Sequence, residues 1–407
     1  MLVQRYCFFT TAGLLLANWS CCQAWQSTVA HHIHSSEVKL NLKKKGQRKM
    51  KAKPSEEEIN RRRAEKAAAK AAKGPSDKKA IIQQEKKRGD PVEEARILRE
   101  EWALSVPLID AGANLQSRNS REEIIRLARR AKAANVKTIV LTGCDLTGSK
   151  EGQEIAEEFK SNDDLTQFLF TAGIHPHSAT EWNHTTSNIL KDFAKSPLLA
   201  ALGECGLDYD RMLAPREIQI ETFKAQAQLA KELDLPLFIH CREKDNAIPK
   251  LGAHLDTVSI LRQVGLNPNR ACVHCFTGDT QDLELLVDFG CYIGFTGFIA
   301  IAKRCAHTLE AISKVGPSAL IPKLIIETDA PFMLPDKSYL PNSFAKKIGI
   351  RGGKNEPAVL PAVAAALAAA LSSSSDCTIS PSDVATLTTN NAHAFFRFPS
   401  SGTRTNK

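Results

Sequence analysis

The stretch LGECGLDYD (202–210) follows an apolar run that begins near Pro197, and glycines bracket its one glutamate, Glu204. The run is typical of a buried strand, so the question is why a carboxylate stands at the strand's expected end. Many strand ends reach solvent, and a charged residue there needs no function. The answer depends on whether other strands along the chain end in the same way.

Similar apolar, β-branched runs recur after Val106, and helical stretches such as SREEIIRLARRAKAAN (120–135) separate them. Strands that are almost continuously apolar indicate a parallel sheet covered on both faces. Eight strand-helix units in succession predict an α/β fold, a (β/α)8 TIM barrel. The alternative is an open doubly wound sheet, but no run is followed by a glycine-rich dinucleotide loop. The runs are VPLID (106–110), VKTIVLTG (136–143), FLFTAGIHP (168–176), LLAALGEC (198–205), LPLFIHC (235–241), ACVHCF (271–276), CYIGFTG (291–297) and KLIIETDAP (323–331).

Polar side chains recur where these strands are expected to end. In a barrel the carboxyl ends of all strands form one face, and active sites are built there. Of the eight histidines that follow residue 34, four fall at these positions. The residues at the expected ends are Asp110, Thr142, His175 with His177, Glu204, His240, His274, Thr296 and Asp329.

Imidazoles and carboxylates around one pocket suit a divalent cation. Imidazole nitrogen binds Zn²⁺, Mn²⁺ or Fe²⁺, and carboxylate oxygen also accepts Mg²⁺. Each residue alone has an ordinary explanation: a backbone partner can satisfy His240, and Asp329 before Ala-Pro can cap a turn. As a set, Glu204, His240, His274 and Asp329 predict a metal site.

Eight motifs in order carry a resemblance to a known family. The chain resembles the TatD family of metal-dependent deoxyribonucleases, within the amidohydrolase-like barrels, over about residues 107–397. The order of the motifs is specific for the family and much less so for the substrate. The motifs are DAGANL (110–115), AGIHPH (172–177), GECGLDYDR (203–211), LFIHCRE (237–243), VHCFTG (273–278), YIGFTG (292–297), IETDAPF (326–332) and KNEPAVLP (354–361).

The resemblance implies metal ligands among the strand-end residues. Glu204 matches the family's glutamate that can bridge two metals, which answers the opening question, because cations would neutralise its charge. His240 and His274 match the strand-end histidine ligands. Asp329 matches the aspartate that binds metal and can accept a proton from the attacking water.

The resemblance also implies residues that contact the substrate. His175 and His177 match a pair that faces the scissile phosphate. Asn355 and Glu356 match a loop motif that closes the barrel mouth and supports the site. Arg211 and Arg242 lie within two of the motifs and are candidates to contact backbone phosphates.

The first strand departs from a pattern common in the family. Many relatives carry His-x-His there, whereas Gly112 and Asn114 occupy the equivalent positions. The TatD-proper branch has the same substitution, so the chain resembles that branch. With only Asp110 and Asn114 to supply oxygens, a first metal site is expected to be weaker, favouring Mg²⁺ or Mn²⁺ over Zn²⁺.

The N-terminal part differs in composition from the rest. Residues 37–102 hold 21 Lys/Arg against 12 Asp/Glu and no aromatic residue before Trp102, whereas residues 103–407 hold 32 against 33. We therefore expect a basic extension over 26–102, disordered or partly helical, which is either a charged linker or an arm that contacts nucleic-acid phosphates. The barrel is expected over 103–398, with a flexible tail at 399–407.

Residues 1–25 are interpreted as a cleaved leader. Arg5 precedes an apolar run, and CQA (22–24) before Trp25 fits a small-residue cleavage site. A segment without acids follows, as in the bipartite leaders of plastid proteins in algae with complex plastids. A plastid is the favoured destination, and the secretory pathway or the cytoplasm are the alternatives. We expect no stable membrane span in the mature protein, an uncleaved anchor being the alternative.

The sequence thus predicts a hydrolase with one or two divalent ions. The favoured reaction is hydrolysis of DNA phosphodiester bonds, from a 3′ end and on single strands. Two alternatives remain: hydrolysis of another ester, such as that of D-aminoacyl-tRNA, or nucleic-acid binding by a protein with an idle barrel. The sequence leaves the oligomeric state undetermined.

Overall fold

The computed structural model describes residues 91–101, 104–244, 249–341, 354–373 and 378–398. The predicted leader, most of the predicted basic extension and the predicted tail lie outside the described residues. Among the helices that are described, none combines the length and the apolar character needed to cross a bilayer.

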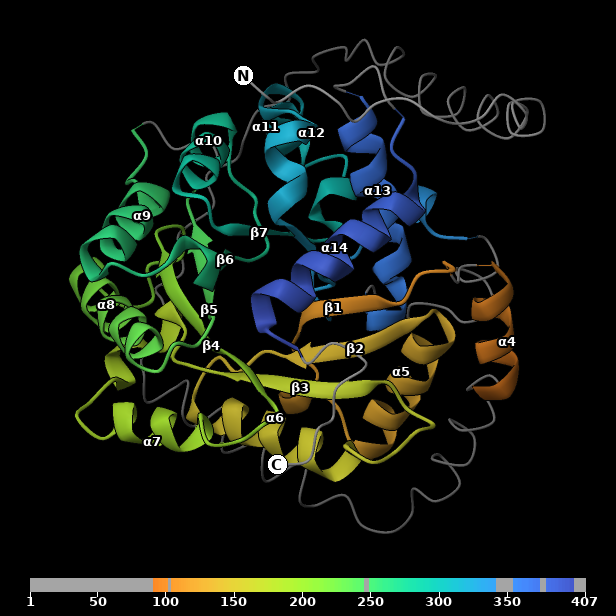
Figure 1. The fold of residues 1–407 in the computed structure, drawn as a ribbon, viewed down its shortest axis with the longest axis horizontal. Coiled ribbons are helices and arrows are strands. Elements are labelled where there is room, and N and C mark those ends of the chain that lie inside the picture. Colours follow the sequence, from red (N-terminus) through yellow and green to blue (C-terminus); the bar gives the residue numbers. More distant parts are fainter. Residues whose placement is uncertain (1–90, 102–103, 245–248, 342–353, 374–377, 399–407) are drawn as a thin grey trace, which may run out of the picture. The chain divides into compact units, whose positions relative to one another are not determined.

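Eight parallel strands are ordered in space as they are in the sequence. A further parallel bridge between Ala113 and Ala330 joins the last strand to the first, so the sheet closes into a barrel (Figure 1). The predicted (β/α)8 fold is confirmed. The strands are β1 (Leu108–Ala113), β2 (Val136–Leu141), β3 (Gln167–Ala172), β4 (Leu199–Asp208), β5 (Leu237–Arg242), β6 (Ala271–Val273), β7 (Tyr292–Phe295) and β8 (Leu324–Ile326).

Helices follow the strands and surround the sheet, as the ribbon shows (Figure 1). Several begin at a side chain that accepts a hydrogen bond from the first turn; Ser120, for example, accepts from the backbone N–H of Glu123. The α-helices are α4 (Pro91–Glu101), α5 (Arg121–Ala133), α6 (Leu146–Phe159), α7 (Thr186–Phe193), α8 (Arg216–Glu232), α9 (Ala253–Val264), α10 (Thr280–Phe289), α11 (Ala306–Val315), α12 (Pro317–Leu320), α13 (Leu360–Ser372) and α14 (Pro381–Phe396). Short 3-10 turns are η2 (Gln116–Arg118), η3 (Pro176–Glu181), η4 (Pro268–Arg270), η5 (Gly297–Ala300), η6 (Ile321–Lys323), η7 (Lys337–Tyr339) and η10 (Pro357–Val359).

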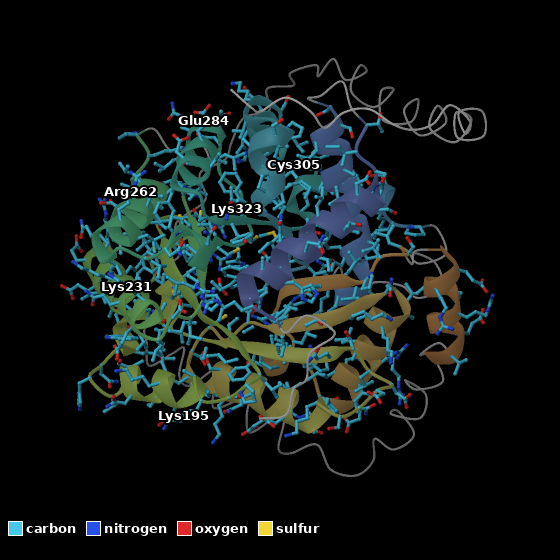
Figure 2. The ribbon with its side chains drawn as sticks, viewed as in Figure 1. Lys195, Lys231, Arg262, Glu284, Cys305 and Lys323 are labelled. Carbon is cyan, nitrogen blue, oxygen red and sulfur yellow. The ribbon has the colours of Figure 1, made fainter. Side chains whose placement is uncertain are left out.

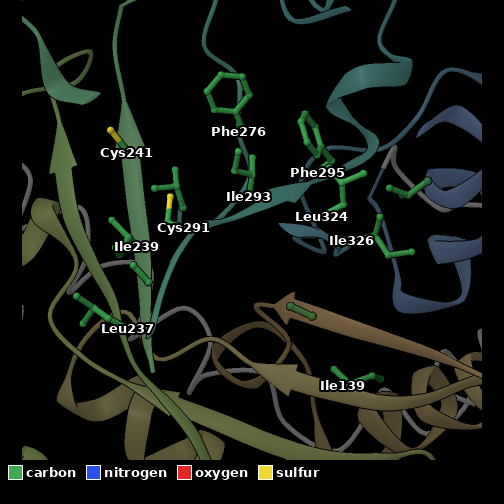
Figure 3. Packing of buried hydrophobic residues seen from close by; sticks show 14 of the residues in the cluster. Ile139, Leu237, Ile239, Cys241, Phe276, Cys291, Ile293, Phe295, Leu324 and Ile326 are labelled. Atoms are coloured by element: carbon green, nitrogen blue, oxygen red, sulfur yellow. The ribbon is translucent and has the colours of Figure 1, made fainter. Parts of the chain in front are cut away.

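The largest apolar core lies between the strands and the helices. Leu237, Ile239 and Cys241 alternate along β5 and belong to this layer (Figure 3). Phe238, which lies between Leu237 and Ile239 in the sequence, belongs to a second apolar cluster that includes Phe395 of α14. Arg262 of α9 and Glu284 of α10, labelled in Figure 2, lie on the outer ring of helices.

Helix α4 packs against the barrel although it precedes residue 103, where the sequence placed the start of the domain. Ile97 and Leu98 are buried in one cluster with Ala133, Ala134 and residues near η10. The segment that holds α4 was assigned to the basic extension because its charged residues dominate its composition. Two apolar side chains are enough to dock it, so the folded unit reaches at least to Pro91.

Candidate active site

A pocket of about 620 Å³ opens among the loops that follow the strands. Its size is within the usual range for small-ligand sites. Seven of the residues predicted to be catalytic or metal-binding meet there, although they come from six different strands or the segments after them. They are Asn114, His175, His177, Glu204, His240, His274 and Asp329.

The glycines around Glu204 allow β4 to lie close to β5. Gly203 and Gly206 have φ angles of 121° and 141°, a region that side-chain-bearing residues avoid. A Cβ at Gly206 would lie 1.9 Å from the carbonyl oxygen of His240. The pairing of β4 with β5 also shifts in register between Leu202 and Cys205, a local bulge. Bulges re-aim side chains, and here Glu204 lies in the pocket.

The expectation that a strand ends at Glu204 is wrong. Strand β4 continues to Asp208, so the glutamate lies inside the strand. Residues two and four positions apart lie on one face of a strand. Asp208 therefore joins Glu204 in the pocket, and the sequence interpretation missed it because it ended the strand too early.

Glu204 lies at the centre of a group of imidazoles. Its Oε1 is 3.2 Å from His175 Nε2, 2.9 Å from His240 Nδ1 and 2.8 Å from His274 Nε2. Burial opposes ionisation of this carboxyl, but the charge of His274 and contacts from His175 and His240 outweigh it and hold its pKa well below the usual range. The pocket therefore contains a stable buried carboxylate.

Asp208 forms a second link between imidazoles. Its Oδ2 lies 2.7 Å from His177 Nε2 and 3.2 Å from His240 Nε2. Burial raises the pKa of Asp208, but hydrogen bonds from these two histidines reverse the effect, and its pKa lies well below the usual range. The buried Gln219 of α8 accepts a hydrogen bond at 2.8 Å from the backbone N–H of Asp208, which fixes this strand end.

His274 is oriented by Glu327, another residue that the sequence interpretation did not assign. His274 Nδ1 lies 3.3 Å from Glu327 Oε2, and the backbone N–H of Cys275 donates to Glu327 Oε1 at 2.6 Å. A Cβ on Gly112 would lie 2.3 Å from Glu327 Oε2. The missing side chain at position 112 therefore provides the space in which the Glu327 carboxylate lies.

Asp329 is held in the pocket by hydrogen bonds to residues in and just after the first strand. Its backbone N–H donates to Gly112, and its Oδ1 accepts a hydrogen bond at 3.0 Å from the side-chain amide of Asn114. Burial raises the pKa of Asp329 to about 8 in the protein alone; Glu327 and Glu204 add to this, whereas His274 opposes it. Such a carboxyl is poised to exchange protons near neutral pH.

Comparisons with known proteins agree with this arrangement. The family described as TatD related DNase matches residues 109–397. The chain belongs to this family. As a TatD-family protein it is a hydrolase that acts on ester bonds and depends on metal.

Two bacterial relatives and two solved structures illustrate the similarity. A protein of Pantoea vagans named 3'-5' ssDNA/RNA exonuclease TatD is 32% identical over 71% of this chain and 99% of that protein. One with the same name from Erwinia amylovora is 34% identical over 63% of this chain and 89% of its own length. A TatD-family hydrolase of Entamoeba histolytica superposes with a TM-score of 0.59 at 23% identity, covering 72% of this chain and 99% of that chain. The Escherichia coli TatD homologue YJJV gives 0.57 at 23% identity, covering 72% and 98%. At these identities the structures support the fold alone.

The donor atoms of this TatD-family pocket fit a divalent metal. The ligand atoms of His175, Glu204 and His240 lie within 4.8 Å of one another. The imidazoles of His175, His240 and His274 share one carboxylate oxygen of Glu204. His240 and His274 each contact a second carboxylate, Asp208 and Glu327 respectively. Imidazole nitrogen with carboxylate oxygen is a donor set for Mn²⁺, Fe²⁺ or Zn²⁺.

Hydrogen bonds separate the roles of two of these histidines. His274 directs Nδ1 to the Glu327 carboxylate, and its Nε2 contacts Glu204 at 2.8 Å; a bound cation would replace the proton on Nε2 and take this nitrogen as a ligand. His175 instead accepts a hydrogen bond at Nδ1 from the backbone N–H of His177, at 3.1 Å. Burial lowers the pKa of His175 to about 4, so the ring is neutral and its proton lies on Nε2. A protonated nitrogen is a donor and not a ligand, so His175 suits a phosphate oxygen better than a metal.

Asp110, predicted as a metal ligand, lies outside the pocket lining. Its carboxylate accepts hydrogen bonds from the backbone N–H and hydroxyl of Thr328, at 2.7 and 2.6 Å. Burial raises its pKa to about 7. Asp110 thus holds the backbone next to Asp329, and Asn114 is the residue of the first strand that reaches the pocket.

Asn355 and Glu356, predicted at the mouth, support the same backbone from below the pocket surface. The Asn355 amide donates to the Thr328 carbonyl oxygen at 2.8 Å. Glu356 forms a buried ion pair with Arg130 of α5. Neither side chain lines the pocket.

The cations around the pocket differ in their partners. Arg211 and Arg242 both line it, but Arg242 forms an ion pair at 2.8 Å with Asp210, whereas the Arg211 side chain is exposed. Two further arginines, Arg118 and Arg304, also line the pocket and were not predicted. No motif marks them, because Arg118 lies in the short 3-10 turn η2 and Arg304 in a turn after η5, and the sequence does not reveal the path of either segment.

Proposed function

We propose that this TatD-family hydrolase is an exonuclease that removes nucleotides from the 3′ end of single-stranded DNA. Its bacterial relatives carry the name 3'-5' ssDNA/RNA exonuclease. The observation that carries the proposal is the buried Glu204 carboxylate shared by three imidazoles in a pocket lined with arginines. A cation bound there would face the phosphate that the arginines attract.

The proposed ligands are Glu204, His240, His274 and Asp329, with Asn114 beside Asp329. When bound, a divalent cation supplies Lewis-acid polarisation of the phosphoryl oxygens and acidifies water. We favour Mg²⁺ or Mn²⁺, because the first strand offers an amide oxygen in place of imidazoles, and oxygen donors suit these harder ions. Zn²⁺ is the alternative at the histidine-rich side.

Residues of the chain are assigned to proton transfer, phosphate binding and the positioning of histidines. Asp329, ionised beside a bound cation, would accept the proton of the attacking water. The Nε2 proton of His175 faces Glu204 at 3.2 Å in this structure; with substrate bound, His175 would donate it to a non-bridging phosphate oxygen, since its Nδ1 is already an acceptor. Asp208 holds His177 and His240 in place through its Oδ2. Arg211 contacts the phosphate backbone.

The proposal is tested with end-labelled substrates. A 5′-labelled single strand of DNA, its RNA counterpart and a duplex are incubated with Mg²⁺, Mn²⁺ or Zn²⁺, or with a chelator. The expected result is stepwise shortening of the single strand with metal and none with chelator. Release of an amino acid from D-aminoacyl-tRNA without any shortening of DNA would favour the other ester, and binding without any hydrolysis would favour an idle barrel.

We further propose that a cleaved leader directs the protein to a plastid. Arg5, the apolar run, CQA (22–24) before Trp25 and the acid-free segment support this order of signals. Fusion of residues 1–60 to a fluorescent protein tests it. Plastid fluorescence is expected, whereas diffuse cytoplasmic signal would refute targeting and signal confined to the secretory pathway would refute the plastid.

A further inference from the structure

Phe332 is an exposed aromatic residue in the lining of the catalytic pocket. With 44% of its surface accessible, it belongs to the few large apolar residues of the described chain that face water. Its backbone N–H donates to the Asp329 carbonyl oxygen at 2.9 Å, so both residues share one turn after β8. The ring is therefore fixed at a short distance along the chain from a proposed catalytic carboxylate.

Arg118 lies against this ring. Its guanidinium carbon is 5.0 Å from the centre of the Phe332 ring, within the range of a cation–π contact. Arg118 belongs to η2, which follows the first strand, whereas Phe332 follows the last one. The contact thus joins the two ends of the barrel seam, and it leaves the ring partly open to solvent.

The charge around this aromatic surface is positive. Arg118, Arg211 and Arg304 are exposed and line the pocket, and within the described ranges none of the three takes part in an ion pair. Arg242, by contrast, is neutralised by Asp210. Aromatic surfaces combined with unpaired cations are how proteins bind single-stranded nucleic acid without sequence preference, since every base has a flat face.

We propose that Phe332 and Arg118 form a stacking subsite for the nucleobase of the 3′-terminal nucleotide. This rests on the proposed function and adds how the end of the strand is held. The base stacks on the exposed surface of the Phe332 ring, and Arg211 and Arg304 contact the neighbouring phosphates. A base in a duplex cannot lie on the ring, so the subsite selects unpaired ends and accepts all four bases.

Binding without hydrolysis tests the subsite. A 5′-fluorescein oligothymidine of eight nucleotides is titrated at low salt in chelator, with fluorescence anisotropy as the readout. A second probe is identical except that its 3′-terminal residue is an abasic tetrahydrofuran. Phe332→Ala should weaken binding of the intact probe about tenfold, whereas Phe332→Tyr should retain it. Wild-type protein should lose a similar factor on the abasic probe, and Phe332→Ala should then add nothing.

A matched control removes another exposed apolar side chain. Leu255 of α9 is 61% exposed and does not line the pocket, so Leu255→Ala should leave both titrations unchanged. Circular dichroism of each variant verifies folding. Equal weakening of the intact and the abasic probe by Phe332→Ala, or no weakening of either, would overturn the subsite.

The outcome also separates the subsite from the proposed function. Base-dependent binding through Phe332 together with no hydrolysis in any metal would support the subsite and refute the nuclease. Metal-dependent hydrolysis with the same KM in wild type and Phe332→Ala would refute the subsite and leave the nuclease in place. Absence of DNA binding by the wild-type protein at low salt would refute the subsite as well.

Discussion

Glu204→Gln is the substitution that most directly probes the pocket, because it keeps the size of the side chain and removes its charge. The carboxylate is only 5% exposed, and three imidazole nitrogens lie between 2.8 and 3.2 Å from its Oε1. An amide can still accept hydrogen bonds through its oxygen, so the fold should persist. A divalent cation would lose a charged ligand in a site with little water to compensate.

The expected loss follows from the position of Glu204. Mutations of residues that only orient ligands commonly cost 10- to 100-fold in metal affinity, so loss of a direct ligand should cost about 100-fold or more. That factor corresponds to about 2.8 kcal/mol of binding free energy. Isothermal titration calorimetry of chelator-treated protein with Mn²⁺ measures it. Glu232→Gln, which alters an exposed pair with Lys191, is the control and should bind Mn²⁺ as the wild type does. Equal Mn²⁺ affinity of Glu204→Gln and wild type would refute Glu204 as a ligand.

Three further predictions concern stability, each measured by chemical or thermal unfolding. Gly206→Ala should destabilise by about 3 kcal/mol or prevent folding, because its Cβ would meet a carbonyl oxygen at 1.9 Å. Gly252→Ala, also at positive φ but with its nearest neighbour at 3.8 Å, should cost only about 1 kcal/mol. Leu98→Ala should lower the free energy of unfolding by about 2 kcal/mol or more, because Leu98 is buried. Val92→Ala should leave it almost unchanged, because Val92 is exposed. Equal stabilities of the two variants would contradict the docking of α4. Buried His254 forms an ion pair with Asp282, with Nδ1 3.3 Å from Oδ1. Burial lowers the pKa of His254, but Cys241 and Asp282 outweigh this and raise it to about 10, so its stabilising contribution should be complete below about pH 6.5 and be lost towards pH 10. The stability difference between wild type and His254→Gln should therefore shrink as pH rises, whereas exposed His184→Gln should show no such trend, and a difference constant with pH would refute the ion pair.

The strands were predictable, and so was the gathering of ionisable residues at one face, because both depend on local patterns. Apolar runs mark buried parallel strands, and ionisable residues such as His240 and His274 stand out against them. The topology then brings those residues to one face whatever the details of each loop. The structure confirms the barrel and places these two histidines in one pocket, whereas their role as metal ligands stays a prediction.

The errors arise where a strand departs from strict alternation. A bulge in β4 turns Glu204 inward within the strand, and the strand continues to Asp208, which the sequence pattern gave no reason to expect. The first strand also shifts register after Asp110, whose carboxylate bonds Thr328 and not the pocket. A one-residue shift exchanges the two faces of a strand, so residue type alone does not identify the side chains that reach a pocket.

Contacts between residues that lie far apart in the sequence could not be predicted from the sequence either. Glu327 lies inside the IETDAPF motif (326–332), yet its role depends on the space next to Gly112. Arg118 follows the first strand of the barrel and Phe332 follows the last one. Closure of the barrel brings the two side chains together. Charge composition likewise concealed α4, whose two buried residues are a small fraction of a charged segment.

Hydrolysis of DNA from a 3′ end by this pocket can be followed in the time course of a 5′-labelled single strand with Mn²⁺. Wild type, wild type in chelator, and Asp329→Asn are compared. The wild type should shorten the strand one nucleotide at a time. Chelator should stop the reaction, and Asp329→Asn should slow it about 100-fold or more while keeping the wild-type circular dichroism spectrum. Undiminished hydrolysis by Asp329→Asn, or in chelator, would contradict the account.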